Sequence, residues 1–231
     1  MEELGVTHGG KLGDFYLSLP IASWLWKTTG KKIRFLLADW FPPFHKIESL
    51  LMQQPFTSRV SLVPVKGLQW GMGCQPWQWN PNDWGVECKE YVNLGWDGWP
   101  NGFATDWCVK CAKVGGWDRD FVLELGPREP NCDVMCTEHI GVPPYYGDQP
   151  RAADVKYIDT GKDILSQVRR FVNADERHCG YSSMAIAMEF CNVPFFLYAS
   201  SQITCRHNFF GHRPRLVTWV CAGTRTPWNG D

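Results

Sequence analysis

The opening third of the chain alternates between strand-like and helix-like patterns. Residues 33–39 (IRFLLAD) are a short apolar run that predicts a buried strand, and residues 60–65 (VSLVPV) predict the next strand. Between them, residues 45–54 (HKIESLLMQQ) predict a helix that ends before Pro55, because proline cannot continue it. Strands and helices that alternate at this spacing predict a parallel sheet with helical crossovers, so the fold class is α/β.

A longer helix is predicted ahead of the first strand. Over residues 15–30 (FYLSLPIASWLWKTTG) the apolar side chains form a broad helical stripe, and Gly30 is a suitable stop. Pro20 lies inside this stretch, removes a hydrogen-bond donor and clashes with the preceding turn. We therefore expect a kink at Pro20 or a helix whose regular part begins near it.

The closing part of the chain returns to the same alternation. Residues 120–126 (DFVLELG), 155–160 (VKYIDT) and 194–199 predict strands. Residues 161–176 predict an amphipathic helix, and residues 183–191 a second helix. The apolar side of the first of these helices consists of Ile164, Leu165, Val168, Phe171 and Val172.

Between the two α/β stretches the periodic pattern disappears. Eight of the 13 tryptophans lie between Trp70 and Trp117, among glycine, proline, asparagine and aspartate. We expect two Rossmann-like lobes that flank an irregular Trp-rich central segment, with a boundary near residue 118. The tryptophans permit two interpretations, a small satellite core under long loops or an exposed aromatic surface that stacks on sugars or nucleobases. Those concerned are Trp77, Trp79, Trp84, Trp96 and Trp99.

Charge is nearly balanced over the whole chain but not along it. The net charge of −1 argues against general coating of nucleic acid. No carboxylate side chain occurs between Glu189 and Asp231, so this tail is basic. Its arginines indicate either a solvated segment or a phosphate site, because arginine holds phosphate through paired hydrogen bonds. The basic and histidine residues of the tail are Arg206, His207, His212, Arg213, Arg215 and Arg225.

Neither a membrane span nor a secretory signal is apparent. No apolar run approaches the roughly 18 residues that a span requires, and the start MEELGVTHGG lacks basic and apolar signal regions. We expect a cytoplasmic protein, in which ten cysteines are free thiols or metal ligands rather than disulfides. Cys108 and Cys111 form a C-x-x-C pair, and Cys132 and Cys136 a C-x-x-x-C pair. Both spacings suit structural zinc, and buried or incidental thiols are the alternative.

The stretch HGGKLGD, residues 8–14, joins the start of the chain to the first predicted helix. Gly9, Gly10 and Gly13 allow backbone conformations and close approaches that side chains would block. Asp14 falls at the helix start, where it is either an N-cap contributing about 1 kcal/mol or an acid that acts on a substrate. The pattern is neither a GxxxxGK[ST] phosphate loop nor a complete GxGxxG fingerprint.

Two separated stretches resemble one known family. GGKLGDFYLSLP is similar to the opening loop of the heptosyltransferase-like (ADP-heptose:lipopolysaccharide) glycosyltransferases, which has a glycine–aspartate pair followed by apolar residues and a proline. ADERHCGYSSMAIAMEFCNVPFFLYAS resembles the donor-binding segment of that family, in which D-S-G-x-x-H precedes a small-residue helix. This chain departs from that pattern at Gly180, Tyr181, Ser182 and Ala185, so the identity of the donor is open.

The resemblance implies a compact GT-B architecture and an inverting, metal-independent glycosyltransferase. Residues 1–118, with the Trp-rich insertion, would form the acceptor lobe, and residues 119–231, with the basic tail, the nucleotide-sugar lobe. Asp14 would be the general base that deprotonates the acceptor hydroxyl, and His8 and Lys11 would contact the acceptor. A nucleotide-sugar would be the substrate and no cofactor would be required. The expected donor-binding residues are Gly13, Gly180, Tyr181, Ser182, Ser183, Met184 and Arg206.

Several interpretations of function stay open at this stage. The acceptor is either a saccharide or a hydroxymethylated DNA base, which would be flipped out of the duplex. The main alternative to an enzyme is a non-catalytic nucleotide- or nucleic-acid-binding module, in which Asp14 caps a helix. A redox or zinc protein built around the cysteine pairs is the third.

Overall fold

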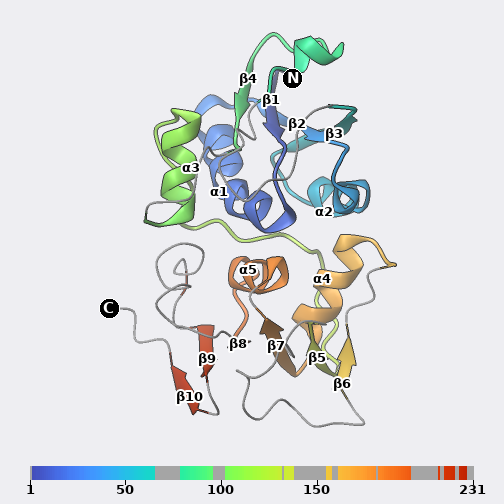
Figure 1. The fold of residues 1–231 in the computed structure, drawn as a ribbon, viewed down its shortest axis with the longest axis vertical. Helices are drawn as coiled ribbons and strands as arrows, with labels where there is room; N and C mark the ends of the chain where they lie inside the picture. The colour runs from blue at the N-terminus through green and yellow to red at the C-terminus, as the bar shows by residue number, and fades with distance from the viewer. Residues whose placement is uncertain are drawn as a thin grey trace. The chain divides into compact units, whose positions relative to one another are not determined.

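The chain folds into two compact units, Met1–Phe121 and Val122–Asp231. The structure, a computed structural model, describes residues 2–65, 79–95, 102–131, 133–137, 155–157, 161–180, 182–198, 213, 216–221 and 224–227. Each unit contains one sheet with helices packed on it (Figure 1).

The first unit is built on a parallel sheet of four strands in the order β3-β2-β1-β4. The strands are β1 (Glu3–His8), β2 (Lys32–Ala38), β3 (Thr57–Val63) and β4 (Tyr91–Asn93). From Leu4 to His8 every residue of β1 is buried, as expected for a parallel strand covered on both faces. The strand order reverses between β1 and β4, because β2 and β3 follow β1 on one side and β4 lies on the other.

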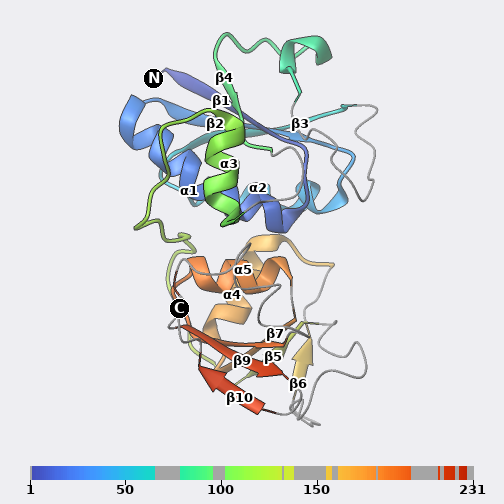
Figure 2. The same ribbon diagram turned by 60° about the vertical axis from the view of Figure 1, so that its left-hand side comes forward.

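The helices of this unit are α1 (Leu12–Thr29), η1 (Pro42–Lys46), α2 (Glu48–Met52), η2 (Pro81–Trp84) and α3 (Ala104–Ala112). α1 is apolar on nearly every side from Phe15 to Ala22 and is buried there, as expected for a helix without a polar face. It ends at Gly30, whose φ of 71° is left-handed and whose N–H donates to Trp26 O at 2.8 Å. α3 lies beside α1 in both views (Figures 1 and 2).

The second unit is built on a sheet of six strands in the order β10-β9-β8-β7-β5-β6. All neighbours are parallel except β9 and β10. The order again reverses once, between β5 and β7. Its strands are β5 (Val134–Cys136), β6 (Val155–Tyr157), β7 (Glu176–Gly180), β8 (Phe195–Tyr198), β9 (Val217–Cys221) and β10 (Thr224–Pro227).

Two helices, α4 (Ile164–Asn173) and α5 (Ser183–Phe190), pack together in this unit. α4 begins at Asp163, whose Oδ1 accepts the Ser166 N–H at 3.1 Å and so caps the helix. All five apolar residues predicted to line one side of α4 are buried. α5 is buried from Met184 to Phe190 and contacts β7 and β8.

Several predicted elements have the right type but different bounds. The first helix begins at Leu12, well ahead of Pro20, so its regular part does not start at the proline. The helix expected over residues 45–54 is divided into η1 and the shorter α2. The Trp-rich central segment contains β4 and α3, neither of which the sequence pattern predicted.

The strand predicted over residues 120–126 is wrong. Phe121, Leu123 and Leu125 are buried whereas Val122 and Glu124 are exposed, so the alternation expected of a strand is present. The segment nevertheless belongs to neither sheet. It contains the boundary between the two units, and the Leu123 N–H donates to Phe190 O, at the end of α5. The alternating burial arises because this connection packs on the first unit at Phe121 and on the second unit from Leu123 onward.

Candidate active site

The first site lies where the strand order of the first unit reverses. In open α/β sheets, ligands bind beyond the carboxyl ends of the strands at such a switch point. The carboxyl ends of β1 and β4 meet here, and the buried Thr7 hydroxyl donates to Asn93 Oδ1. Asn93 Oδ1 also accepts the Trp79 N–H at 3.0 Å. Sequence reasoning missed both Thr7 and Asn93, although a polar residue that closes a short strand is a usable signal.

The loop that leaves β1 at this point is held by two side chains. The Gly10 N–H donates to His8 Nδ1 at 3.0 Å, and Trp40 Nε1–H donates to Gly9 O at 3.0 Å. A Cβ on Gly10 would stand 2.8 Å from His8 Cε1 and 3.4 Å from Asp14 Oδ2. Glycine is therefore required at position 10 by a close approach, between the histidine ring and the carboxylate.

Asp14 lies in the first turn of α1, three residues after the N-cap. The N-cap is Lys11, which makes no side-chain cap hydrogen bond, so the interpretation of Asp14 as the N-cap is wrong. The residue is half-buried, and burial of its carboxyl raises the pKa of Asp14 to about 6. A hydrogen bond that the carboxyl accepts from the Lys11 backbone, together with the Lys11 charge, acts against this rise. At neutral pH the carboxylate is ionised and more basic than an ordinary aspartate.

The other predicted residues of this loop differ in exposure. His8 is 1% exposed, and burial lowers its pKa to about 3, so its ring is neutral. Lys11 is exposed, and Gly13 is the second residue of α1. Together with Asp14 they lie on one continuous segment at the carboxyl edge of the sheet.

A second site lies where the strand order of the second unit reverses. The carboxyl ends of β5 and β7 meet there, and the Gly180 N–H donates to the Thr137 hydroxyl oxygen at 2.8 Å. Thr137 is itself tied to β7, because its N–H donates to His178 O at 3.0 Å. Sequence reasoning missed Thr137 because β5 was not predicted.

α5 begins directly after this point. Ser182 is its N-cap, and Ser183 and Met184 are its first two residues. The Ser182 hydroxyl oxygen is buried and makes no hydrogen bond to any residue that the structure describes. The first N–H groups of a helix have no partner within it, and together with the helix dipole they favour anions. Tyr181 and Arg206 lie outside the described residues.

The two predicted cysteine pairs belong to different units, Cys108 and Cys111 to the first and Cys132 and Cys136 to the second. Cys108 lies on α3 in the first unit, where its Sγ–H donates to Leu94 O at 2.8 Å, whereas Cys136 lies on β5 in the second. Burial raises the pKa of Cys108 far above its usual range and that of Cys136 to about 12. Cys132 lies outside the described residues, among which no cluster of three or more histidine, cysteine or acidic side chains is able to hold a metal ion.

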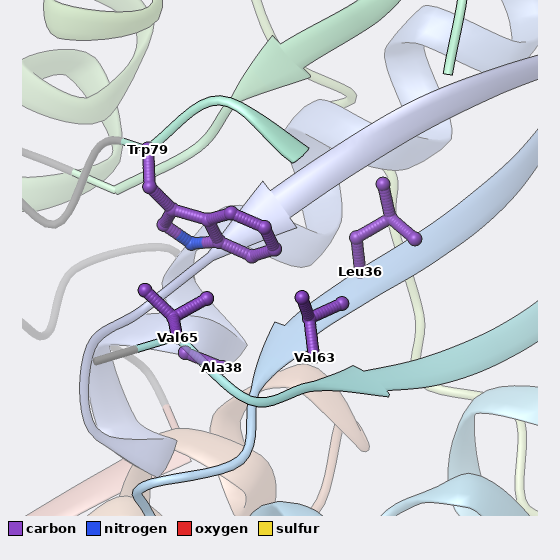
Figure 3. Close-up of a cluster of buried hydrophobic side chains, with 5 residues drawn as sticks. All are labelled: Leu36, Ala38, Val63, Val65 and Trp79. Carbon is purple, nitrogen blue, oxygen red and sulfur yellow. The ribbon is translucent and has the colours of Figure 1, made fainter. Parts of the chain in front are cut away.

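Part of the Trp-rich centre forms a satellite core. Trp79 packs on Leu36, Ala38, Val63 and Val65 beside the carboxyl ends of β2 and β3 (Figure 3). Trp40 and Trp84 are half-buried against the same cluster. Trp77, Trp96 and Trp99 lie outside the described residues, as does most of the basic tail. Searched over its described part, the chain has no helix that is long and apolar enough to cross a bilayer.

No protein-family model matches the sequence, and no curated protein matches it. Among solved structures, TibC from enterotoxigenic E. coli H10407, an iron-containing dodecameric heptosyltransferase solved with ADP-D-beta-D-heptose, is 13% identical with a TM-score of 0.49 and covers 86% of this chain and 58% of its own. The E. coli heptosyltransferase WaaC with ADP is 8% identical with a TM-score of 0.48, over 85% of this chain and 87% of its own.

A third solved structure is similar over nearly the whole chain. It is the glycosyl transferase family 9 protein from Veillonella parvula DSM 2008, with a TM-score of 0.59 and 11% identity over 95% of this chain and 85% of its own. This likeness confirms the predicted fold class, α/β with two Rossmann-like lobes. The fold of this chain is therefore similar to that of this glycosyl transferase family 9 protein.

Proposed function

We propose that the protein is an inverting glycosyltransferase, which moves a sugar from a nucleotide-sugar donor to an acceptor hydroxyl with Asp14 as the general base. One observation carries the proposal. A half-buried carboxylate with a pKa of about 6 lies at the switch point of the first sheet, where ligands of α/β folds bind. A base is most effective when its pKa lies near the working pH, and burial brings Asp14 closer to neutrality.

The reaction needs one proton transfer and one displacement. The acceptor oxygen forms a bond to the anomeric carbon from the face opposite the diphosphate. The bond from that carbon to the diphosphate oxygen breaks, and its electron pair stays on the departing oxygen. The acceptor proton passes to Asp14. We assign acceptor binding to residues 1–118, with Lys11 at the rim of the site, and donor binding to residues 119–231.

The donor diphosphate is assigned to the switch point of the second sheet. The start of α5 supports this assignment, because its N–H groups and the buried Ser182 hydroxyl are suited to phosphate oxygens. We propose that these groups offset the charge of the leaving diphosphate without a metal ion. Within the second unit, the residues assigned to the donor are Gly180, Tyr181, Ser182, Ser183, Met184 and Arg206.

A saccharide is the acceptor that the charges favour. Residues 1–121 contain equal numbers of basic and acidic residues, twelve of each, so the unit assigned to the acceptor has no net charge. A duplex DNA acceptor would call for an excess of lysine and arginine to neutralise phosphates. Hydroxymethylated DNA is therefore tested below as the alternative acceptor.

The test is transfer by Asp14→Asn. Parent and variant are incubated with a panel of nucleotide-sugars, with saccharide and hydroxymethylated DNA acceptors and with or without a chelator. We expect the variant to bind donor as the parent does and to lose about 10²- to 10⁴-fold in kcat. Asp120→Asn, at an exposed position, is the matched control and should transfer at the parental rate. Parental transfer by Asp14→Asn would contradict the role of Asp14, and donor binding without transfer by the parent would favour the non-catalytic module.

A further inference from the structure

His8 occupies an environment that suits an apolar side chain better than a histidine. Its ring is 1% exposed and meets Phe15 and Phe44 edge to face, with centroids 5.2 Å and 6.2 Å away. Burying a polar group without full hydrogen bonding costs free energy. Leucine would pack against the two phenylalanines without this cost, so packing alone does not explain a histidine here.

The two ring nitrogens of His8 have different surroundings. Nδ1 accepts the Gly10 N–H at 3.0 Å, which assigns the proton of the neutral ring to Nε2. Nε2 is buried and lacks a hydrogen bond of ordinary geometry to the described residues. The Asp14 backbone lies close to the ring and acts against the lowering of the His8 pKa by burial. The ring thus touches the loop at Gly10 through Nδ1 and the start of α1 at Asp14.

Gly10 transmits this contact to the carboxylate. The position of its missing Cβ is 2.8 Å from His8 Cε1, 3.4 Å from Asp14 Oδ2 and 3.5 Å from Asp14 Cβ. The ring and the carboxylate therefore both crowd the same face of Gly10, the one that a Cβ would occupy. A change in the ring that released the Gly10 N–H would let the Gly10 backbone shift, and the carboxylate packed against it would shift as well.

We propose that His8 is the positioning residue of this site, which fixes the Gly10 turn through Nδ1 and thereby sets the orientation and burial of the Asp14 carboxylate. This inference rests on the proposed function for its catalytic consequence but not for its structural content. It replaces a direct contact between His8 and the acceptor, because the ring has almost no exposed surface. His8 itself transfers no proton and touches no substrate.

Three substitutions at His8 distinguish the effect of the hydrogen-bond acceptor Nδ1 from the effect of the ring's packing on Phe15 and Phe44. In His8→Asn, the side-chain oxygen occupies about the place of Nδ1 and can accept from Gly10. In His8→Gln, the polar group lies one bond farther from the backbone and misses the Gly10 N–H. In His8→Leu, an apolar side chain packs against Phe15 and Phe44 and offers no hydrogen-bond acceptor to Gly10. His45→Gln, at the exposed histidine of η1, is the matched control for the loss of an imidazole.

The first readout is transfer by the whole chain. We expect kcat to fall about 10²-fold in His8→Gln and His8→Leu, the size of loss that follows a small misplacement of a reacting group. The donor KM should stay at the parental value, His8→Asn should restore most of the rate, and His45→Gln should match the parent. His8→Leu should unfold at the same or higher denaturant concentration than the parent, so its loss of rate would not follow stability.

The second readout is independent of activity. The Asp14 carboxyl is titrated by carbon NMR, and its signal is assigned from its absence in Asp14→Asn. Among the described residues, the charged and titratable groups that interact with the Asp14 carboxyl are Lys11 from the loop and Cys108 from α3, and all three variants retain both. We expect the parent and His8→Asn to titrate alike, and His8→Gln and His8→Leu to titrate at lower pH because water reaches the carboxyl.

Two results decide the inference. An unchanged Asp14 titration and parental kcat in His8→Leu and His8→Gln would overturn it. If the parent transfers no sugar at all, the proposed function fails, and the NMR titration alone still decides whether His8 positions Asp14. Should His8→Leu not fold, the comparison between the two amide variants remains, since they differ by one methylene.

Discussion

At the scale of single residues, Asp14 lowers the stability of the folded chain. Its pKa is about 6 in the folded state, whereas an unfolded aspartate titrates near 3.9. Between these values the folded chain retains a proton that the unfolded chain has released. The free energy of unfolding therefore falls as the pH rises from about 4 to about 6.

We expect Asp14→Asn to be more stable than the parent at pH 8, by an amount on the order of 1–3 kcal/mol, because an amide does not carry the penalty of a buried charge. At pH 4 the difference should shrink, since the parent carboxyl is then mostly protonated in the folded state. Urea unfolding of both proteins at the two pH values measures it. A stability difference that is the same at pH 4 and pH 8 would contradict the raised pKa. Loss of transfer together with a gain in stability would mark Asp14 as a residue kept for function.

At the scale of elements, the end of the first unit is tied to α1 through Asp118. The Asp118 carboxylate accepts the Ser23 hydroxyl at 2.6 Å and pairs with Lys27 at 2.7 Å, and its N–H donates to Pro20 O at 3.0 Å. Burial alone would raise the pKa of Asp118, but the hydrogen bonds from Lys27 and Ser23 outweigh it and hold the pKa below its usual range. Asp118 lies outside any periodic pattern of the sequence, yet it holds the chain that follows α3 against α1.

Substitution of Asp118 tests this attachment. We expect Asp118→Asn to lower the free energy of unfolding at pH 7 by about 1.5–3 kcal/mol, the range for hydrogen bonds to charged groups. A lowered carboxyl pKa stabilises the folded state above the unfolded value of about 3.9 and loses this effect as the pH falls through the folded value. The difference from the parent should therefore vanish in acid. Lys27→Met, which retains the Ser23 bond, should cost less, and equal losses in the two variants would contradict the arrangement.

Elements with a strong local pattern were predictable. The strand at 33–39 was found because a continuous apolar run reflects burial on both faces of a parallel sheet. The strand at 60–65 was found from its apolar run, although β3 lies at the edge of the sheet and is mostly half-buried or exposed. α4 was found because its five apolar residues recur with helical spacing and Asp163 caps it. For the site, the position of Asp14 at the start of the first helix was predictable from HGGKLGD, since glycines and an acid before an apolar run mark a helix entry.

Other features depend on tertiary contacts that no local pattern reports. β4 and β5 are three residues each, and their place in a sheet follows from neighbouring strands rather than from their own residues. The 120–126 segment has the alternation of a strand but no partner strand. The burial of His8 follows from Phe44, which is distant in the sequence. Asn93 and Thr137 could be recognised as site residues only once the strand orders placed them at the switch points.

At the scale of the whole molecule, each unit carries one switch point, and the two differ in chemistry. The first presents a carboxylate of raised pKa beside the neutral His8. The second presents a helix N-terminus and the buried Ser182 hydroxyl. Both sites contain the start of a helix, which attracts anions, but the first turn of α1 carries the Asp14 carboxylate, which repels phosphate, whereas the first turn of α5 carries no acidic residue. The two sites are therefore suited to different parts of a reaction.

This difference between the two sites predicts where a nucleotide binds. We expect ADP, GDP or UDP at about 100 times its dissociation constant to slow amide exchange at residues 180–187 by up to about 100-fold. Residues 8–15 should exchange as in the free protein, because the opening loop is assigned to the acceptor. Hydrogen exchange read by mass spectrometry measures both segments, with inorganic phosphate as the comparison ligand. Protection confined to residues 8–15 would reverse the assignment of the two units.

The extended segment from Phe121 to Leu125 has a consequence for engineering. None of the strands that the structure describes pairs with it, and the exposed Val122 and Glu124 alternate with the buried positions. An inserted residue or a break at Val122 would leave every β-ladder of both units in place. The segment is therefore a suitable fusion point for chimaeras that combine the first unit of one such protein with the second unit of another.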